Sequence, residues 1–207
     1  MTFRRLPLAA MLLLTMVVVP ACAHVPAAGA VAASAAPAVS PMLVVVVRHA
    51  EKAPLPANDP VLSEAGMARA AALDGAVRSL PITDVVVSHL QRTRLTASAF
   101  LARTGVPVHV VPIGSAGVAA HVKAVADTVR ALSRLSGHTG VLVVGHSNTV
   151  TDIVQALGGA PSAALCDSQY SQLFTVRGDA RGGVVATRTT YGAADPVDAS
   201  CGAMAPR

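Results

Sequence analysis

The feature that most constrains the fold is a regular alternation of short, β-branched apolar runs with longer helical segments. The runs have the length and valine content of buried strands and span residues 42–47, 83–87, 106–111 and 140–145. Between and after them, apolar residues recur at helical spacing over residues 63–80, 91–103, 117–135 and 148–157. Residues 170–177 and 183–190 alternate like a hairpin at a sheet edge. The pattern predicts an α/β fold, a three-layer sandwich with a mostly parallel central sheet and helices on both faces.

Local signals refine two of these elements. Ser63 directly precedes the first helical segment and is a plausible N-cap. Pro107 has no N–H to donate to a neighbouring strand, so the run 106–111 is expected at an edge of the sheet.

Chemistry is expected at one edge of this sheet, because ligands of such folds bind outside the carboxyl ends of the strands. Arg48 and His49 follow the first run, Arg92 follows the second, and His146 follows the fourth. Arginine grips phosphate in a bidentate manner, and a neutral imidazole is a competent nucleophile. A second, protonated imidazole and the helix that starts near Asn148 add positive charge for a phosphoryl group, so this chemistry needs no metal ion or other cofactor.

The residues at these strand ends form recognisable motifs. They read Arg48-His49-Ala50, then Ser88-x-x-x-Arg92-Thr93-x-x-Thr96-Ala97, and finally Gly145-His146-Ser147-Asn148-Thr149. With Leu62-Ser63-Glu64-Ala65-Gly66 between the first two, the chain resembles the histidine phosphatase superfamily, which has the phosphoglycerate-mutase-like fold, over about residues 43–177.

The resemblance implies a metal-independent phosphomonoester or phosphoramidate hydrolase that acts on a small phosphorylated substrate or a phosphoprotein. His49 would become phosphohistidine, and the other phosphate-binding residues would be Arg48, Arg92, His146, Ser147 and Asn148, with Thr93 as a further hydrogen-bond donor. Glu51 either orients a neighbouring basic group or pairs at the surface with a charge such as Lys52.

The chain departs from the family at the general acid. Many members carry a glutamate in the loop after the third strand, but residues 112–117 read PIGSAG, without a carboxylate. The acid-phosphatase branch has an aspartate after its second histidine, where this chain has Ser147. His121 and Asp59 are the remaining candidates for the proton donor. A missing acid favours substrates with good leaving groups, and it also motivates an alternative function, a non-catalytic phospholigand-binding domain of the cell envelope.

Two other kinds of site do not fit the residues. The segment 145–149 resembles a nucleophile elbow, but position 149 is threonine and no histidine follows His146 to complete a triad. The histidines lack the H-x-x-x-H or H-E-x-x-H spacing of zinc ligands, so no metal site is predicted.

The N-terminus predicts export. Residues 1–22 combine Arg4 and Arg5 with an apolar stretch too short to span a bilayer, and end in a lipobox-like Val-Pro-Ala-Cys. Cys22 is therefore the expected lipidation site, residues 23–41 an Ala/Pro-rich flexible linker, and residues 42–207 the catalytic domain. The protein is expected in the periplasm or cell envelope, anchored to a membrane by lipid.

Composition bears on the remaining partners. Cleavage before Cys22 removes two arginines and no acidic residue, which lowers the formal charge from +5 to +3, and only 2% of residues are aromatic. A nucleic-acid partner is not predicted, because stacking surfaces and basic runs are both lacking.

In an oxidising compartment, Cys166 and Cys201 are expected to form a disulfide that pins the C-terminal tail.

Overall fold

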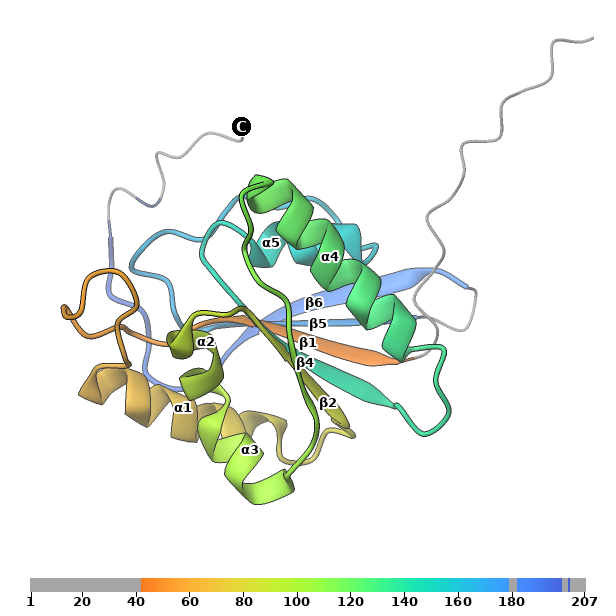
Figure 1. Cartoon of the computed structure of the whole chain (residues 1–207), viewed down its shortest axis with the longest axis horizontal. Helices are drawn as coiled ribbons and strands as arrows, with labels where there is room; N and C mark the ends of the chain where they lie inside the picture. Colours follow the sequence, from red (N-terminus) through yellow and green to blue (C-terminus); the bar gives the residue numbers. More distant parts are fainter. Residues whose placement is uncertain (1–41, 179–181, 199–200, 202–207) are drawn as a thin grey trace, which may run out of the picture. The chain divides into compact units, whose positions relative to one another are not determined.

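A six-stranded sheet with the order β3-β2-β4-β1-β5-β6 forms the centre of the domain (Figure 1). The computed structural model describes residues 42–178, 182–198 and 201, so the predicted signal peptide, Cys22 and the linker 23–41 lie outside the described residues. Within the described part of the chain, no helix has the length and apolar character needed to cross a membrane.

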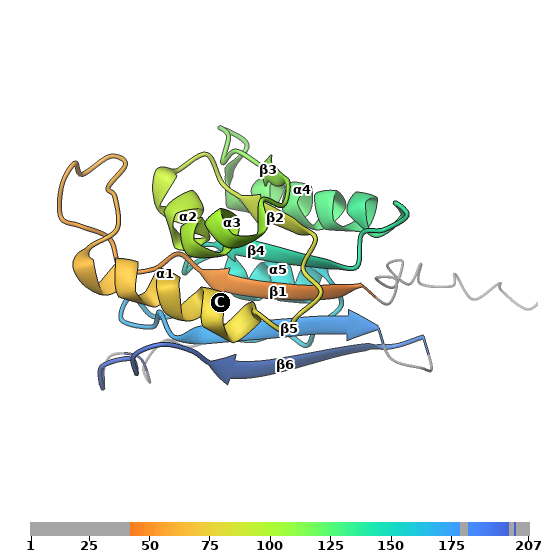
Figure 2. The same cartoon turned by 90° about the horizontal axis from the view of Figure 1, so that it is seen from below.

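The strands and helices follow the predicted alternation, and Figure 2 shows the strands side by side in their sheet order. The strands are β1 (Leu43–Arg48), β2 (Asp84–Val87), β3 (Val108–Val110), β4 (Gly140–Gly145), β5 (Gln172–Gly178) and β6 (Val184–Thr190). The helices are α1 (Glu64–Val77), α2 (Gln91–Thr96), α3 (Ser98–Thr104), α4 (Gly117–Leu132) and α5 (Val150–Ala156). Strands β1 to β4 pair in parallel, whereas β5 and β6 form the predicted antiparallel hairpin. The mostly parallel sheet is thus confirmed, with β3 at one edge as Pro107 indicates.

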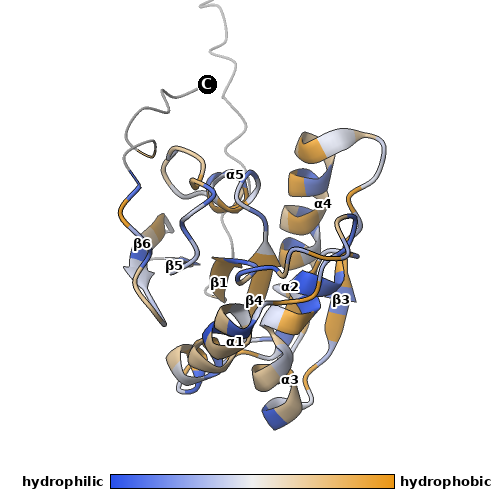
Figure 3. Ribbon diagram, turned by 90° about the vertical axis from the view of Figure 1, so that its left-hand side faces the viewer, coloured by the Kyte–Doolittle hydropathy of each residue, from blue (hydrophilic) through white to orange (hydrophobic). Residues whose placement is uncertain are grey.

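Alternate residues of the central strands feed two separate cores. Val44 and Val46 of β1 pack in one core with α4 and α5, while Val45 and Val47 face α1 and α3 on the other side. Figure 3 shows the strongly hydrophobic strands β1 and β4 between these layers. Helices on both faces leave only the strand ends free to carry polar groups, which confirms the predicted three-layer arrangement.

The prediction of one continuous helix over residues 91–103 is wrong. Two helices, α2 and α3, meet at Ala97. The Thr96 hydroxyl donates to the Arg92 carbonyl (2.8 Å) and accepts from the Ala50 N–H (2.8 Å). Back-bonding of this kind bends helices, and here it also ties the second motif to the first.

Helix α1 begins as predicted. The Ser63 hydroxyl accepts from the Gly66 N–H (3.2 Å), which caps the helix. A Cβ atom on Gly66 would lie 2.1 Å from the Glu51 carbonyl oxygen, so only glycine lets α1 approach the residues after His49 this closely.

A fully buried carboxylate holds together three segments toward the other end of the sheet. Asp84, which begins β2, lies 2.8 Å from Nε2 of His109 and 2.6 Å from Nδ1 of His138, and Thr83 donates to it at 2.9 Å. Burial by itself would raise the pKa of Asp84, but the hydrogen bonds from these groups outweigh it and lower the pKa.

We expect Asp84→Asn to lower the free energy of unfolding by about 2 kcal/mol at neutral pH, since a buried acceptor for several donors is lost. Because the folded-state pKa is depressed, this contribution is present above the unfolded pKa of about 3.9 and is lost as the pH falls through the folded value. Urea unfolding at neutral and acidic pH measures the difference between wild type and variant.

The matched control is Asp152→Asn, on an exposed position of α5. A difference between wild type and Asp84→Asn that stays constant down to strongly acidic pH would show that ionised Asp84 does not stabilise the fold.

Candidate active site

The carboxyl ends of β1, β2 and β4 open into a pocket of about 430 Å³. Side chains from all three predicted motifs line it, together with residues of α4 and of two loops. The lining residues are Arg48, His49, Lys52, Arg92, Ile113, Val118, His121, His146, Ser147, Asn148, Thr149 and Asp167. Parallel pairing of β1 with β4 places Arg48 opposite Gly145, so the first and third motifs leave the sheet side by side.

His49 is buried and held in one tautomer. Its Nδ1 lies 2.8 Å from the Ala50 carbonyl oxygen, which can only accept, so Nδ1 carries the proton and Nε2 keeps its lone pair. Burial lowers the pKa of His49 to about 4; the Ala50 carbonyl opposes the shift, and the charges of Arg48 and Arg92 add to it. The imidazole is therefore neutral at physiological pH, as a nucleophile requires.

His146 lies edge-on to His49, with 5.3 Å between ring centroids. Its Nε2 is 3.0 Å from the Ser88 hydroxyl. Burial, followed by the neighbouring His49 and Arg92, lowers the pKa of His146 to about 3. A bound dianion would reverse the electrostatic part of this shift and favour the protonated ring.

The loop before β5 determines where the Arg48 guanidinium lies. Nη1 donates to the carbonyl oxygens of Cys166, Asp167 and Gln169 at 2.8, 2.9 and 3.0 Å. The guanidinium carbon lies 3.9 Å from the ring centroid of Tyr170, a cation–π contact, and Nη2 is 3.8 Å from the Asp167 carboxylate.

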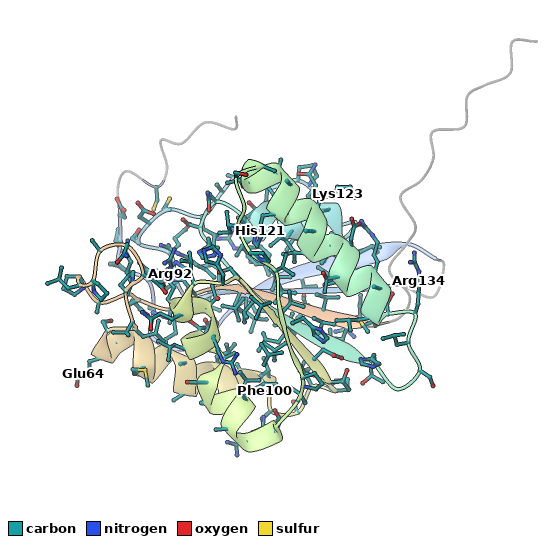
Figure 4. All side chains as sticks on the ribbon, in the orientation of Figure 1. Glu64, Arg92, Phe100, His121, Lys123 and Arg134 are labelled. Carbon is teal, nitrogen blue, oxygen red and sulfur yellow. The ribbon has the colours of Figure 1, made fainter. Side chains whose placement is uncertain are left out.

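Arg92 lies in the first turn of α2 and approaches the pocket from another side (Figure 4). Its Nη1 is 3.9 Å from the Asp59 carboxylate. Within the described chain, the buried Nε atoms of both Arg92 and Arg48 have no hydrogen-bond partner. Unpaired buried donors are costly, and two guanidinium groups that line the same pocket fit an oxyanion.

The third wall of the pocket is largely apolar. Ile113 and Val118 line it together with His121 of α4 (Figure 4). Nδ1 of His121 lies 3.3 Å from the Pro112 carbonyl oxygen, and burial lowers the pKa of this histidine. The ring is thus neutral with its proton on Nδ1, which leaves Nε2 as an acceptor.

The structure brings together the predicted phosphate-binding side chains. Arg48, His49, Arg92, His146, Ser147 and Asn148 all line the pocket, as does His121. The sequence interpretation missed Lys52, Ile113, Val118, Thr149 and Asp167, which also line it. Lys52 and Thr149 lie close in the chain to the Arg-His and His-Ser-Asn motifs, and this proximity is the signal that could have found them.

The structure corrects the expected role of Thr93 and decides between the two alternatives for Glu51. Thr93 is fully buried and bonds to Ser88 and the Leu90 carbonyl, so it supports His146 through Ser88 rather than binding phosphate. Glu51 does not pair with Lys52: its carboxylate takes a two-pronged ion pair from buried Arg69 (2.7–2.9 Å). Glu51 therefore orients a neighbouring basic group, the guanidinium of Arg69.

The helix after the third motif begins later than predicted. Helix α5 starts at Val150, and the N–H groups of Thr149 and Val150 both donate to the His146 carbonyl. These two donors hold the motif in place and are not available to a ligand.

The expected disulfide is not formed in this structure. Cys166 is a buried free thiol and Cys201 a half-buried one. The two thiols are neighbours, and the hydrogen bond between their side chains is the largest cause that raises the pKa of Cys166, to about 11. In the described residues, no group of three or more histidine, cysteine or acidic side chains is arranged to hold a metal ion.

Comparison with known families gives one sequence match. The family model of the histidine phosphatase superfamily (branch 1) matches residues 44–113, which contain the first two motifs but not His146. Curated protein sequences give no match.

Solved structures share the fold at low sequence identity. The protein histidine phosphatase SixA in complex with tungstate has a TM-score of 0.56 and 22% identity, covering 72% of this chain and 97% of SixA. Mycobacterial glucosyl-3-phosphoglycerate phosphatase has a TM-score of 0.53 and 15% identity, over 74% and 99% of the two chains. The α-ribazole phosphatase from Shigella flexneri has a TM-score of 0.52 and 18% identity, over 76% and 100%.

Inorganic phosphate should bind the pocket, and Arg92→Ala should weaken its affinity about 10- to 100-fold. A hydrogen bond to a charged group contributes about 1.5–3 kcal/mol, and about 1.4 kcal/mol corresponds to a factor of ten. Isothermal titration calorimetry measures the affinity of both proteins.

Arg134→Ala, at an exposed position beyond the end of α4 (Figure 4), is the control and should bind like wild type. Equal phosphate affinity in wild type and Arg92→Ala would mean that the pocket does not use this guanidinium.

Proposed function

We propose that this chain, which has the fold of the histidine phosphatase superfamily and matches its family model across the first two motifs, is a metal-independent phosphatase that works through a phosphohistidine on His49. The reaction is the hydrolysis of a phosphomonoester or a phosphoramidate. The observation that carries the proposal is a neutral imidazole that keeps its Nε2 lone pair and lines one pocket with two guanidinium groups, whose Nε atoms have no partner among the described residues.

In the first step, Nε2 of His49 attacks phosphorus while the bond to the leaving group breaks. The Ala50 carbonyl keeps the proton on Nδ1, so the nucleophile needs no deprotonation. Arg48 and Arg92 stabilise the negative charge on the phosphoryl oxygens. His146, protonated once the dianion is bound, adds a further positive charge opposite His49.

In the second step, water attacks the phosphohistidine, and His49 leaves as the neutral imidazole. Water supplies a hydroxide to phosphorus, and its other proton goes to the solution or to a neighbouring acceptor. His121 is suited to that acceptor role, because its Nδ1–H is committed to Pro112 and Nε2 keeps a lone pair. The same features and the lowered pKa make it a poor proton donor to the leaving group.

The lack of an identified proton donor limits which leaving groups, and therefore which substrates, suit the site. Asp59 and Asp167 lie near the pocket, but each faces one of the phosphate-binding arginines rather than the apolar wall. Leaving groups that depart with little protonation, such as imidazoles and other amines of phosphoramidates or aryl alcohols, therefore suit the site best. The structural neighbour SixA is a protein histidine phosphatase, which supports a phosphoramidate substrate for this chain.

The proposed place of action is the cell envelope. The support comes from residues 1–41 alone: a basic and apolar leader, the lipobox-like end at Cys22 and an Ala/Pro-rich tether. A lipid on Cys22 would hold the phosphatase domain at a membrane surface, where its substrate is a small phosphorylated compound or a phosphoprotein.

Replacement of His49 by alanine should abolish turnover of an aryl phosphate or a phosphohistidine peptide, by at least about 10³-fold, because the nucleophile is removed. Wild type, quenched during turnover and kept alkaline, should carry a phosphoryl group on His49 by mass spectrometry. His109→Gln, which alters a histidine outside the pocket, is the control and should remain active, and a chelator should leave wild-type activity unchanged.

A wild-type protein that binds phosphate but neither turns over nor becomes labelled would support the non-catalytic phospholigand-binding alternative instead. Activity that disappears with a chelator and returns with an added metal would contradict the proposed mechanism.

The acid limb of kcat/KM should lie near pH 4, well below the value of about 6.5 for an unperturbed histidine. The nucleophile acts as the neutral imidazole, and a depressed pKa keeps it neutral until the pH falls to about 4. The measurement is a pH profile, corrected for ionisation of the substrate and checked for folding by circular dichroism. A decline centred near the unperturbed value would show that burial and the arginines do not set the ionisation of His49.

A further inference from the structure

Arg48 is positioned by a loop far from it in the chain. Backbone carbonyls of Cys166, Asp167 and Gln169 accept from Nη1, and the ring of Tyr170 stacks on the guanidinium. Within the described chain these contacts leave the buried Nε of Arg48 without a partner, and the side chain itself lines the pocket. The direction in which the N–H groups of Arg48 point therefore depends on the backbone of residues 166–170.

A single carboxylate from the C-terminal segment fastens the end of this loop. Asp195 accepts from the N–H groups of Tyr170 and Ser171, both at 2.8 Å. It also accepts from the Ser171 hydroxyl at 2.7 Å and from the Gln172 side-chain amide at 3.0 Å. Burial would raise the pKa of Asp195, but the Ser171 and Gln172 hydrogen bonds outweigh it and lower the pKa, so all four donors meet a carboxylate.

The same C-terminal segment is attached on its other side to the residues after His49. Arg69, which pairs with Glu51, donates to the carbonyl oxygens of Tyr191 (3.1 Å) and Ala193 (2.9 Å). Closer to the end of the segment, the Ser168 hydroxyl donates to the Asp198 carboxylate at 2.9 Å. The segment 191–198 thus connects the scaffold of the first motif with the loop that holds Arg48.

We propose that the segment 191–198 is a clamp that positions Arg48 for phosphate, and that Asp195 is its positioning residue. Asp195 makes no hydrogen bond or ion pair to Arg48 among the described residues and does not line the pocket; it acts through the backbone of Tyr170 and Ser171, beside a longer-range attraction to the Arg48 charge. The inference rests on the proposed function only in that Arg48 binds a phosphoryl group.

The two thiols lie where they would close the clamp covalently. Cys166 provides one of the carbonyls that hold Arg48, and its thiol neighbours that of Cys201, which also lies 3.3 Å from the Ser168 hydroxyl. Exchange with a small-molecule disulfide, such as oxidised glutathione, would form the Cys166–Cys201 bond and release two equivalents of the reduced thiol. The expected disulfide therefore becomes a proposed covalent lock on the same loop.

The test is a double-mutant cycle read out by the affinity for inorganic phosphate. Asp195→Ala should weaken binding about tenfold in wild type but have no further effect in an Arg48→Ala background, because a positioning residue has nothing left to position. Asp195→Glu should recover part of the loss. Asp127→Ala, on the exposed face of α4, is the matched control and should bind like wild type.

Equal losses in both backgrounds, or a lowered melting temperature with unchanged affinity, would show that Asp195 is merely structural and overturn the proposal. If Asp195→Ala fails to fold, the same cycle can be completed with Ser171→Ala. This variant removes one of the four hydrogen bonds, so a smaller loss of phosphate affinity is expected. Because the cycle measures binding, it tests the clamp separately from the proposed function. A protein that binds phosphate without turnover would contradict the proposed function but not the clamp.

The covalent lock has its own measurement. Wild type treated with oxidised glutathione should lose two hydrogen masses, keep its phosphate affinity and melt at a higher temperature, since the cross-link restricts the unfolded chain. Cys201→Ser should show neither change. A mixed disulfide with glutathione, or a cross-link that abolishes phosphate binding, would contradict the lock.

Discussion

The site depends on positive charge that the protein buries without fully neutralising it. Two guanidinium groups reach the same strand ends, and within the described residues the buried Nε of each is left without an acceptor. The nearest carboxylates, Asp59 and Asp167, stand 3.9 and 3.8 Å away and so compensate only in part. Burial, with that positive charge as a smaller contribution, lowers the pKa of both His49 and His146, and the unneutralised charge makes an oxyanion the natural complement of the site.

Neutrality matters differently for the two imidazoles. In the proposed mechanism a neutral His49 is the nucleophile, and its tautomer is set by a backbone carbonyl that no side-chain substitution can remove. The pKa of His146 is lowered by burial first and then by its neighbours, including Arg92. A bound phosphoryl dianion would favour the protonated form of His146 and leave the Nδ1–H of His49 bonded to the Ala50 carbonyl. In the proposed mechanism one ring is therefore the nucleophile, and the other adds positive charge beside it.

Much of the polar structure around the pocket serves to hold these groups rather than to touch a substrate. Ser88 and Thr93 support His146, and Thr96 ties the backbone after His49 to α2. The loop that carries the Arg48 acceptors has no regular secondary structure, so it depends on side chains such as Asp195 for its shape. This distribution is typical of sites in which orientation must be maintained against the mobility of loops.

The fold and the meeting of His49 and His146 at one edge of the sheet could be predicted from sequence, whereas the supporting contacts could not. The valine runs predict the strands, and the rule that ligands bind at the carboxyl ends of such strands places the two histidines at the same edge. The break at Ala97 was invisible, because helical spacing of apolar residues continues across it and only the Thr96 hydroxyl interrupts the helix. Glu51 was ambiguous for a similar reason, since its partner Arg69 comes from a helix whose packing the sequence does not specify.

By itself, then, the sequence determined the order of strands and helices and the residue types at each strand end, because apolar periodicity and turn signals act over a few neighbouring residues. Only the tertiary structure decided the tautomer of His49, the partners of Arg48 and the role of the C-terminal segment. Those features rest on backbone carbonyls and on contacts between residues more than a hundred positions apart, and a carbonyl leaves no mark in the identity of its residue.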